Sequence, residues 1–397
     1  MRFSPLVDRI AGEGSRAWDI HFQAVERQRR GEEVILLSVG DPDFRTPQPI
    51  VERAIESLQA GRTRYTPING EPELRAAIAR WHEKLTGLTV DPAEVVVTAG
   101  AQNGLFLSAL CLLAPGDEVI VPVPMYVTYE AVFAATGARA VAIPSAAEKG
   151  FHPDPAAIAA AVTERTRAIY INTPHNPTGA VLTRAELEAI AEICREHDLW
   201  LVCDEVYAAL TFEGEHVSPC TLPGMAERTV VVSSLSKSHA MPGWRAGWMI
   251  APSGLAAHAH NLLLCSLYGL PGFVQDAARH ALEAAGEDLA AMRARYRARR
   301  DLVCDALAGA PGLLARKPEG GMFVMIDVRG TGLGAQAFAQ ALLDRYAVSV
   351  LPGEGFGAAA AGHLRLSLTA SEEVLAEACR RIAALATTVA AAQEAAN

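Results

Sequence analysis

The feature that most constrains this fold is a regular alternation of short apolar runs and helix-like segments between residues 95 and 235. Two of the runs, 95–97 and 230–232, consist only of valine, a β-branched residue that favours strands. The segments between the runs include 101–113 and 184–197, which are long enough to form helices. Strands that alternate with helices build a mainly parallel sheet with helices on both faces. We therefore expect an α/β fold.

The pattern changes after residue 251, where a long helical region runs to about residue 308. A second, smaller α/β unit follows, with strands expected at 320–327 and 363–368. The chain has 397 residues, which is too long for one small core and suits two domains. We expect the following parts: an N-terminal arm at 1–13, a large domain at 49–295, and a small domain formed by 14–48 and 296–397.

The composition is that of an ordinary soluble globular enzyme, with 50% hydrophobic and 20% charged residues. The net charge is −10, and the only basic block, 293–300, reads as the solvated face of a helix, so no nucleic-acid partner is expected. The seven cysteines include no Cys-x-x-Cys pair, which favours reduced thiols in a cytoplasmic protein without a metal site. No apolar run approaches membrane-spanning length, and no membrane partner is expected.

The segment 229–250 carries the first chemical signal, because Lys237 lies between two apolar strands. A buried ammonium is costly unless it is paired or used covalently. Ser234, Ser236 and Arg245 lie close to it in the sequence and could hold a phosphate. A lysine amine beside a phosphate site suggests a covalent link to pyridoxal phosphate. The alternative, a basic surface hairpin, is disfavoured by the apolar flanks on both sides.

Three polar residues stand where apolar strands end or continue. Asp204 follows the apolar run 199–203, so it needs a cationic partner, either a core arginine or a protonated heterocyclic nitrogen. Asn176 follows the strand expected at 167–172, at the edge where α/β sheets bind ligands. Arg365 lies inside an apolar strand and needs a carboxylate, from the protein or from a substrate.

Two glycine-containing turns are weaker signals. The turn at 98–103 opens a helix, where the backbone N–H groups of Ala101 and Gln102 could bind an anion. Such turns are common in α/β proteins. Gly40 follows the strand expected at 33–39, and it forms either a tight connection or a close approach of backbone to ligand.

These stretches together resemble the fold-type I pyridoxal-phosphate enzymes of the class I/II aminotransferase family, over nearly the whole chain. No single motif is decisive, but their order along the chain is that of the family. The motifs are Ser-Val-Gly-Asp-Pro-Asp-Phe at 38–44, Asn-Pro-Thr-Gly at 176–179, Asp-Glu-Val-Tyr at 204–207, Ser-Leu-Ser-Lys at 234–237, Gly-Trp-Arg-Ala-Gly at 243–247 and Leu-Arg-Leu at 364–366.

The resemblance implies a three-layer, aspartate-aminotransferase-like fold with pyridoxal 5′-phosphate as cofactor. It also implies ping-pong transfer of an α-amino group from an L-amino acid to a 2-oxo acid, in a homodimer with shared active sites. Lys237 would hold the cofactor and move the substrate proton, Asp204 would pair with the pyridine nitrogen, and Arg365 would bind the α-carboxylate. The other implied contacts are Asn176 and Tyr207 to the ring hydroxyl, Asn176 also to the substrate, Tyr126 to the ring face, Ala101, Gln102, Ser234, Ser236 and Arg245 to the phosphate, Gly40 over the substrate, and Tyr65 to the phosphate of the neighbouring subunit.

The chain departs from the family pattern at Pro242, where threonine is common, and at Glu354, where serine is frequent. The family's second arginine, which binds acidic side chains, cannot be identified, and this disfavours aspartate as the donor. Within the family, the stretches 17–21, 213–219 and 234–241 resemble the branch that transfers the amino group of arginine to pyruvate. We therefore expect L-arginine and pyruvate as substrates.

An arginine donor requires a site for its guanidinium group. Trp18 could supply an aromatic face, and Asp19, Glu13 or Glu354 a carboxylate. Trp18 could equally be a core residue, and Asp19 and Glu354 a helix cap and a solvated turn. The alternative functions are an aminotransferase with an aspartate or aromatic donor, and a β-lyase on the same scaffold. A non-enzymatic regulator is disfavoured because the catalytic set is complete.

Overall fold

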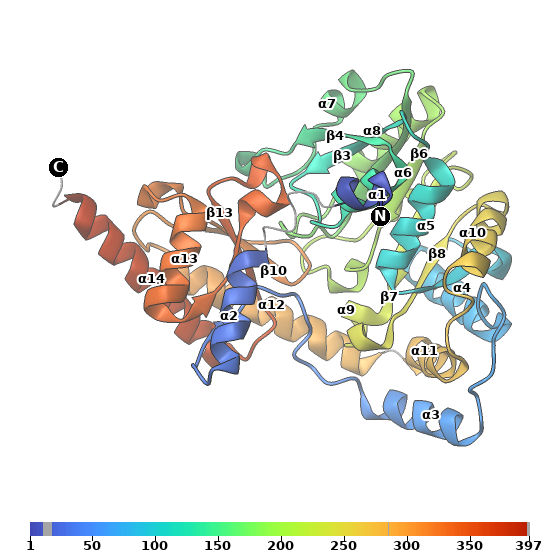
Figure 1. The fold of residues 1–397 in the computed structure, drawn as a ribbon, viewed down its shortest axis with the longest axis horizontal. Helices are drawn as coiled ribbons and strands as arrows, with labels where there is room; N and C mark the ends of the chain where they lie inside the picture. The colour runs from blue at the N-terminus through green and yellow to red at the C-terminus, as the bar shows by residue number, and fades with distance from the viewer. Residues whose placement is uncertain (11–17, 285, 395–397) are drawn as a thin grey trace.

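The structure, a computed structural model, describes residues 1–10, 18–284 and 286–394. Figure 1 shows a larger part built around one wide sheet and a smaller part that contains β10, β13, α13 and α14. The long helix α12 (Glu287–Leu307) runs from one part into the other. No helix in the described ranges is long and apolar enough to cross a membrane.

The large sheet has seven strands in the order β2-β8-β7-β6-β5-β3-β4. Only β8 runs antiparallel to its neighbours, which confirms the predicted mainly parallel sheet. The parallel strands therefore deliver their carboxyl ends to one edge. The strands are β2 (Val95–Ala99), β3 (Glu118–Val123), β4 (Arg139–Pro144), β5 (Thr166–Asn172), β6 (Trp200–Asp204), β7 (Thr229–Ser234) and β8 (Ala246–Ile250).

Helices cover both faces of this sheet, because successive strand residues point to opposite sides. Val95 and Val97 pack with helices α3, α4 and α11, whereas Val96 packs with α5, α6 and α10. Helix α8 covers the first face farther along the sheet, over β5 and β6. The helices of the larger part are α3 (Gln48–Gln59), α4 (Pro72–Thr86), α5 (Ala101–Leu112), α6 (Tyr129–Thr136), α7 (Pro155–Ala160), α8 (Arg184–Glu196), α9 (Leu235–Ser238), α10 (Ser253–Cys265) and α11 (Gly272–Ala284).

The smaller part combines α2 and β1, from near the N-terminus, with the C-terminal part of the described chain. Its four-stranded sheet has the order β12-β13-β10-β9, and β1 pairs in parallel with β11. The domain boundaries drawn from the sequence stay a prediction. The remaining elements are α1 (Pro5–Arg9), which contacts α6, and, in the smaller part, α2 (Asp19–Arg29), β1 (Ile35–Leu36), β9 (Leu314–Arg316), β10 (Phe323–Asp327), α13 (Ala335–Tyr346), β11 (Val348–Ser349), β12 (Leu351–Pro352), β13 (His363–Ser367) and α14 (Glu372–Glu394).

Two expectations need correction. The strand expected at 33–39 is regular only at Ile35–Leu36. At Leu37 the hydrogen bonding changes from one neighbouring strand to another, because Leu37 N donates to Ser349 O at 2.8 Å and Leu37 O accepts from Ser367 N at 2.9 Å. The basic block at 293–300 is not wholly solvated. Arg299 and Arg300 are buried, since Arg299 pairs with Asp43 at 2.8 Å and Arg300 with Glu213 at 3.0 Å.

Candidate active site

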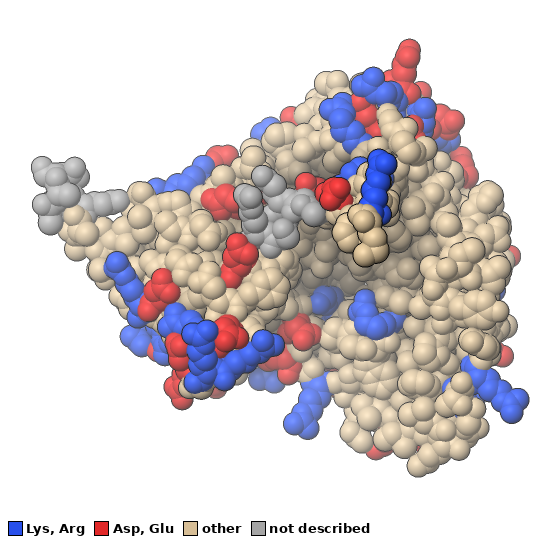
Figure 2. All heavy atoms as spheres, in the orientation of Figure 1, with Lys and Arg blue, Asp and Glu red and all other residues tan. Residues whose placement is uncertain are grey.

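A cavity of about 360 Å³ lies where the strand ends of the larger part face the smaller part. On the face shown in Figure 2, the surface is hollowed between these two parts. The wall of the cavity contains thirteen of the predicted site residues: Trp18, Gly40, Ala101, Gln102, Tyr126, Asn176, Asp204, Tyr207, Ser234, Ser236, Lys237, Arg245 and Arg365.

Lys237 reaches the cavity from the short helix α9, directly after β7. Ser234 caps this helix by accepting from Ser236 N, so the strand-to-helix turn holds the lysine in place. The Lys237 ammonium donates to the backbone oxygen of Gly40. Burial lowers the pKa of Lys237 to about 8, and Arg365 and Arg245 act in the same direction while Asp41 opposes them. A partly deprotonated amine is therefore available near neutral pH.

One end of the cavity is suited to an anion. Helix α5 begins there with no side-chain cap, so its first backbone N–H groups, at Ala101 and Gln102, point to the cavity end. Arg245 lies against the same turn and donates to Ala99 O at 3.1 Å and to Pro242 O at 2.7 Å. Ser234 and Ser236 supply hydroxyl groups on the same wall.

Asp204 lies at the buried end of β6. Burial raises its pKa to about 6, although the Tyr129 hydroxyl donates to its carboxylate at 2.9 Å and Val206 N at 3.2 Å. Among the described residues, no arginine, lysine or histidine forms an ion pair with Asp204. The core-arginine alternative is therefore not observed, and the carboxylate is left for a cationic ligand group.

A chain of hydrogen bonds joins this strand end to the substrate side of the cavity. Asn172 Nδ2 donates to Asp204 O at 2.8 Å, and Asn172 Oδ1 accepts from Asn176 N at 2.7 Å. Asn176 Oδ1 then accepts from Arg365 at 3.0 Å. Asn172 and Tyr129 were not predicted as site residues. Asn172 could have been found because it is the last residue of its strand, where Asp204 also stands.

Arg365 is buried in the middle of β13. Its guanidinium carbon lies 4.1 Å from the ring centre of Phe323 and 4.8 Å from that of Phe356. Nη2 donates to Ser38 O at 2.7 Å, while Nε has no hydrogen-bond partner among the described atoms. Burial lowers the pKa of Arg365 to about 10. No described carboxylate pairs with it, so its guanidinium is available to an anionic ligand group.

The residues proposed for the donor side chain are only partly brought together. Trp18 lines the cavity and packs with Val127, Leu351 and Phe356. Asp19 begins α2 and does not line the cavity, and Glu354 accepts from Gly362 N at 3.1 Å instead of facing it. Glu13 lies outside the described residues.

Tyr65 also lies away from this cavity. Its side chain is 88% exposed and stacks edge-on with Tyr268, at 5.1 Å between ring centres. It does not contribute to the site of its own chain.

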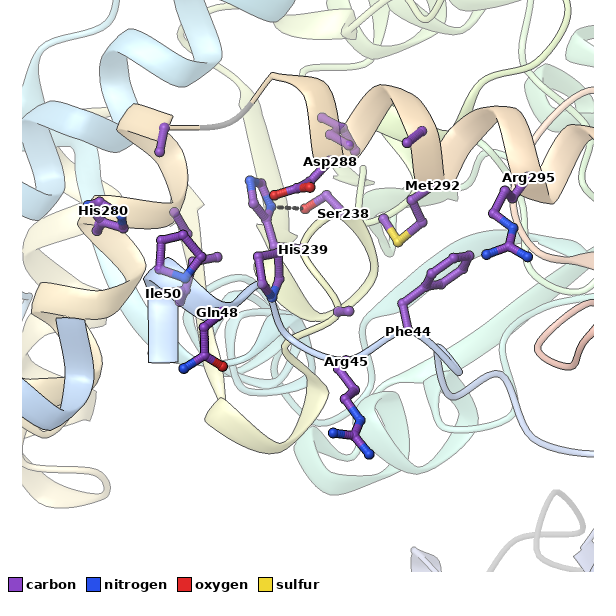
Figure 3. A pocket seen from close by; sticks show the side chains of 17 residues that line it. Phe44, Arg45, Gln48, Ile50, Ser238, His239, His280, Asp288, Met292 and Arg295 are labelled. Carbon is purple, nitrogen blue, oxygen red and sulfur yellow. Dashed lines mark hydrogen bonds between the residues drawn. The ribbon is translucent and has the colours of Figure 1, made fainter. Parts of the chain in front are cut away.

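A second cavity, of about 570 Å³, lies at the end of helix α9, which carries Lys237, and Ser238, His239 and Ala240 are among the residues that line it. Figure 3 shows Asp288, Met292 and Arg295 projecting into it from α12. It shares no residue with the cavity of Lys237, and none of the predicted site residues lines it.

Comparison with known proteins agrees with this geometry. The model of the aminotransferase class I and II family matches residues 32–382. Arginine–pyruvate transaminase of Pseudomonas aeruginosa is 59% identical over 96% of this chain and 98% of its own length. Aspartate aminotransferase of Thermus thermophilus, solved with maleate, is 38% identical with a TM-score of 0.92, covering 97% of this chain and 100% of that one. The Rhizobium meliloti aspartate aminotransferase has a TM-score of 0.92 at 31% identity, with 98% and 99% coverage.

The fold and the matches define an enzyme that transfers amino groups. This chain belongs to the aminotransferase class I and II family, and it depends on pyridoxal phosphate. The residues present fit that cofactor. The helix N-terminus with Arg245 suits a phosphate, the uncompensated carboxylate of Asp204 suits a protonated ring nitrogen, and the Lys237 amine suits an aldehyde.

Proposed function

We propose that the enzyme transfers the α-amino group of L-arginine to pyruvate by a ping-pong mechanism. The observation that supports the reaction type is the buried guanidinium of Arg365, which pairs with no described carboxylate, on the same cavity wall as the Lys237 amine and the Asp204 carboxylate. The choice of arginine and pyruvate is supported by the 59% identity, over nearly the full length of both chains, to a transaminase of that specificity.

Lys237 is the proposed catalytic base. Bound pyridoxal phosphate supplies a ring that accepts the electron pair left at the donor Cα. Lys237 Nζ takes the Cα proton, for which its lowered pKa of about 8 is suited. When the cofactor is bound, Asp204 would hold the proton on its ring nitrogen, and Asn176 and Tyr207 would donate to its ring hydroxyl. Tyr126 would pack on the ring, and the phosphate would be held by Ala101, Gln102, Ser234, Ser236 and Arg245.

Arg365 is the proposed carboxylate-binding residue. Its bond to Asn176 and its contacts with Phe323 and Phe356 hold the guanidinium plane in one orientation. A planar guanidinium fixed in this way can bind a carboxylate with two parallel hydrogen bonds. Gly40 would close over the same group. A Cβ atom at Gly40 would lie 2.3 Å from the Phe323 ring, so a larger residue could not take this position.

For the donor side chain we propose Trp18, whose ring on the cavity wall offers a face for a guanidinium. The role first expected for Asp19 would require a rearrangement of the start of α2, since Asp19 does not line the cavity here.

We also propose a homodimer with shared active sites. Tyr65 and Tyr268 form an exposed aromatic pair, and Phe106, Leu110 and Leu264 expose apolar side chains on the neighbouring helices α5 and α10. Exposed apolar groups of this kind favour a protein–protein contact. Tyr65 would then reach the phosphate in the neighbouring subunit. A cytoplasmic location is part of the proposal, because all seven cysteines are free thiols.

A screen of the common L-amino acids, with pyruvate and with 2-oxoglutarate as acceptors, tests the specificity. We expect the largest kcat/KM for arginine and the formation of alanine. If arginine were inactive while aspartate or aromatic donors reacted, the specificity proposal would fail and the family assignment would stand. Pyruvate and ammonia released from cystathionine without an acceptor would instead indicate a β-lyase.

A further inference from the structure

Strand β6 ends at Asp204, the next residue is Glu205, and both of these carboxylate side chains are buried. Successive residues at a strand end point to opposite sides. Asp204 faces the cavity, while Glu205 faces the packing between β6, β7 and the loop after η4 (Ala208–Leu210). Two neighbouring buried anions repel each other, and the charge of Glu205 does raise the pKa of Asp204.

Glu205, unlike Asp204, has a basic side chain beside its carboxylate among the described residues. His216 Nε2 lies 3.2 Å from its carboxylate, and the Ser218 hydroxyl donates to the other carboxylate oxygen. Burial alone would raise the pKa of Glu205, but His216 and Ser218 lower it overall. The side chain of His216 is only 8% exposed, so its contact with Glu205 is shielded from solvent.

The other titratable groups around Glu205 act on its carboxylate less strongly than His216 does; His82 also lowers the pKa of Glu205, as the smallest of the contributions. Cys203 lies beside it in β6, and burial raises the pKa of that thiol. Cys220 lies 3.1 Å from Ser218 Oγ and 3.5 Å from His82 Nε2, and burial lowers the pKa of His82. His216 is therefore the group that can balance the charge of Glu205.

We propose that His216 neutralises Glu205 so that Asp204 remains the one uncompensated negative charge at the end of β6, reserved for the protonated ring of the cofactor. His216 does not line the cavity and is a positioning residue that acts through charge. This inference rests on the proposed role of Asp204.

The test compares His216→Asn, Glu205→Gln and the double variant as holoenzymes. The visible absorbance of the bound cofactor is followed between pH 5 and 10, and its midpoint is determined. Asn at 216 can still donate a hydrogen bond but carries no charge. In His216→Asn, the negative charge of Glu205 would lack its partner and would favour the protonated form of the bound cofactor. The pH midpoint of the cofactor absorbance should therefore rise by roughly half a pH unit or more. The double variant, again neutral at this pair, should return to the wild-type midpoint.

Three results would overturn the inference: an unchanged midpoint in His216→Asn, a double variant that stays shifted like the single one, or a raised midpoint in Glu205→Gln. If His216→Asn does not fold, the midpoint of Glu205→Gln tests the inference. His152→Asn is the matched control, because His152 also lies between carboxylates but at a distance from this strand end. If the wild-type protein showed no cofactor absorbance, the proposed function itself would fail. If the wild-type protein showed this absorbance and His216→Asn left its pH midpoint unchanged, only the inference about His216 would fail.

Discussion

Arg365 Nη1 donates to Asn176 Oδ1 at 3.0 Å, although the two residues are 189 positions apart in the chain. Asn176 follows β5 of the large sheet, and Arg365 lies in the middle of β13 in the small sheet. This one bond joins the wall that we assign to the cofactor to the guanidinium that we assign to the substrate. A movement of the two parts relative to each other would therefore change the positions of the cofactor-binding and substrate-binding residues.

The first prediction concerns Arg365→Lys. A single ammonium cannot replace two parallel hydrogen bonds, so kcat/KM should fall by about 100-fold or more. The loss should be similar for every L-amino acid donor, because the contact is with the α-carboxylate. Steady-state kinetics with several donors measure it. Arg329→Lys is the control, since Arg329 is exposed and pairs with Asp327 outside the cavity. A loss confined to one donor would contradict the assignment.

The second prediction concerns Tyr129→Phe. The hydroxyl of Tyr129 lowers the pKa of Asp204, so its removal should move that pKa above its value of about 6. Fewer molecules then carry the ionised carboxylate, and kcat/KM should fall about 10-fold at neutral pH. The loss should be larger at pH 6 than at pH 8. Tyr170→Phe is a matched control, because its hydroxyl shares a hydrogen bond with Ser108 and not with Asp204. A pH-independent loss would argue against this route.

The third prediction is a pH profile for the donor half-reaction. A base acts only when it is unprotonated, and burial lowers the pKa of Lys237 to about 8. The single-turnover rate should therefore rise with pH, with a midpoint near 8, and level off above it. Rapid mixing of holoenzyme with a saturating donor gives this rate. A constant rate from pH 6 to 9 would exclude Lys237 as the group whose titration limits the step.

The fourth prediction concerns stability and His152, which joins α8 of the larger part to Glu319 of the smaller part. Its ring nitrogens lie 2.9 Å from Glu186 and 3.2 Å from Glu319, and these hydrogen bonds raise its pKa to about 10 from a usual value of 6.5. The stabilisation is thus complete below pH 6.5 and is lost as pH rises towards 10. His152→Asn should lower the free energy of unfolding by about 1 to 2 kcal/mol at pH 6.

Chemical denaturation of wild type and His152→Asn at several pH values provides this comparison. The difference between the two proteins should shrink steadily above pH 6.5 and vanish near pH 10. A difference that is equal at pH 6 and pH 10 would show that the cost comes from packing instead of charge.

The fifth prediction tests the shared site. Lys237→Ala and Tyr65→Ala homodimers should each be impaired, whereas a hybrid of the two contains one site with neither defect. If equal amounts of the two variants are mixed, unfolded and refolded together, their subunits pair at random. About a quarter of the wild-type number of sites should then be restored. Activity after mixing, compared with each variant refolded alone, measures the recovery. No recovery would place Tyr65 outside the neighbouring site.

Much of the large sheet could be predicted because its strands are continuous apolar runs. Each such run can be recognised in the sequence without knowledge of the others. The run that ends at Asp204 and the run that precedes Lys237 also indicated these two polar residues as site candidates. Tyr129 was not recognised, since a tyrosine in a helix gives no sign that its hydroxyl meets a carboxylate 75 residues away. Arg299 and Arg300 were placed on the surface because charge alone suggested it, and their partners come from distant segments.

The sequence by itself determined the kind of fold and the identity of the reactive groups, since both depend on local patterns: apolar periodicity, strand ends and short motifs. Only the tertiary structure decided which of these groups share a cavity. Among the described residues, it left Arg365 without a carboxylate partner, placed His216 beside Glu205 but no basic side chain beside Asp204, and kept Asp19 off the cavity wall. The physical reason is that burial and charge compensation are set by contacts between distant segments, and these contacts exist only once the chain has folded.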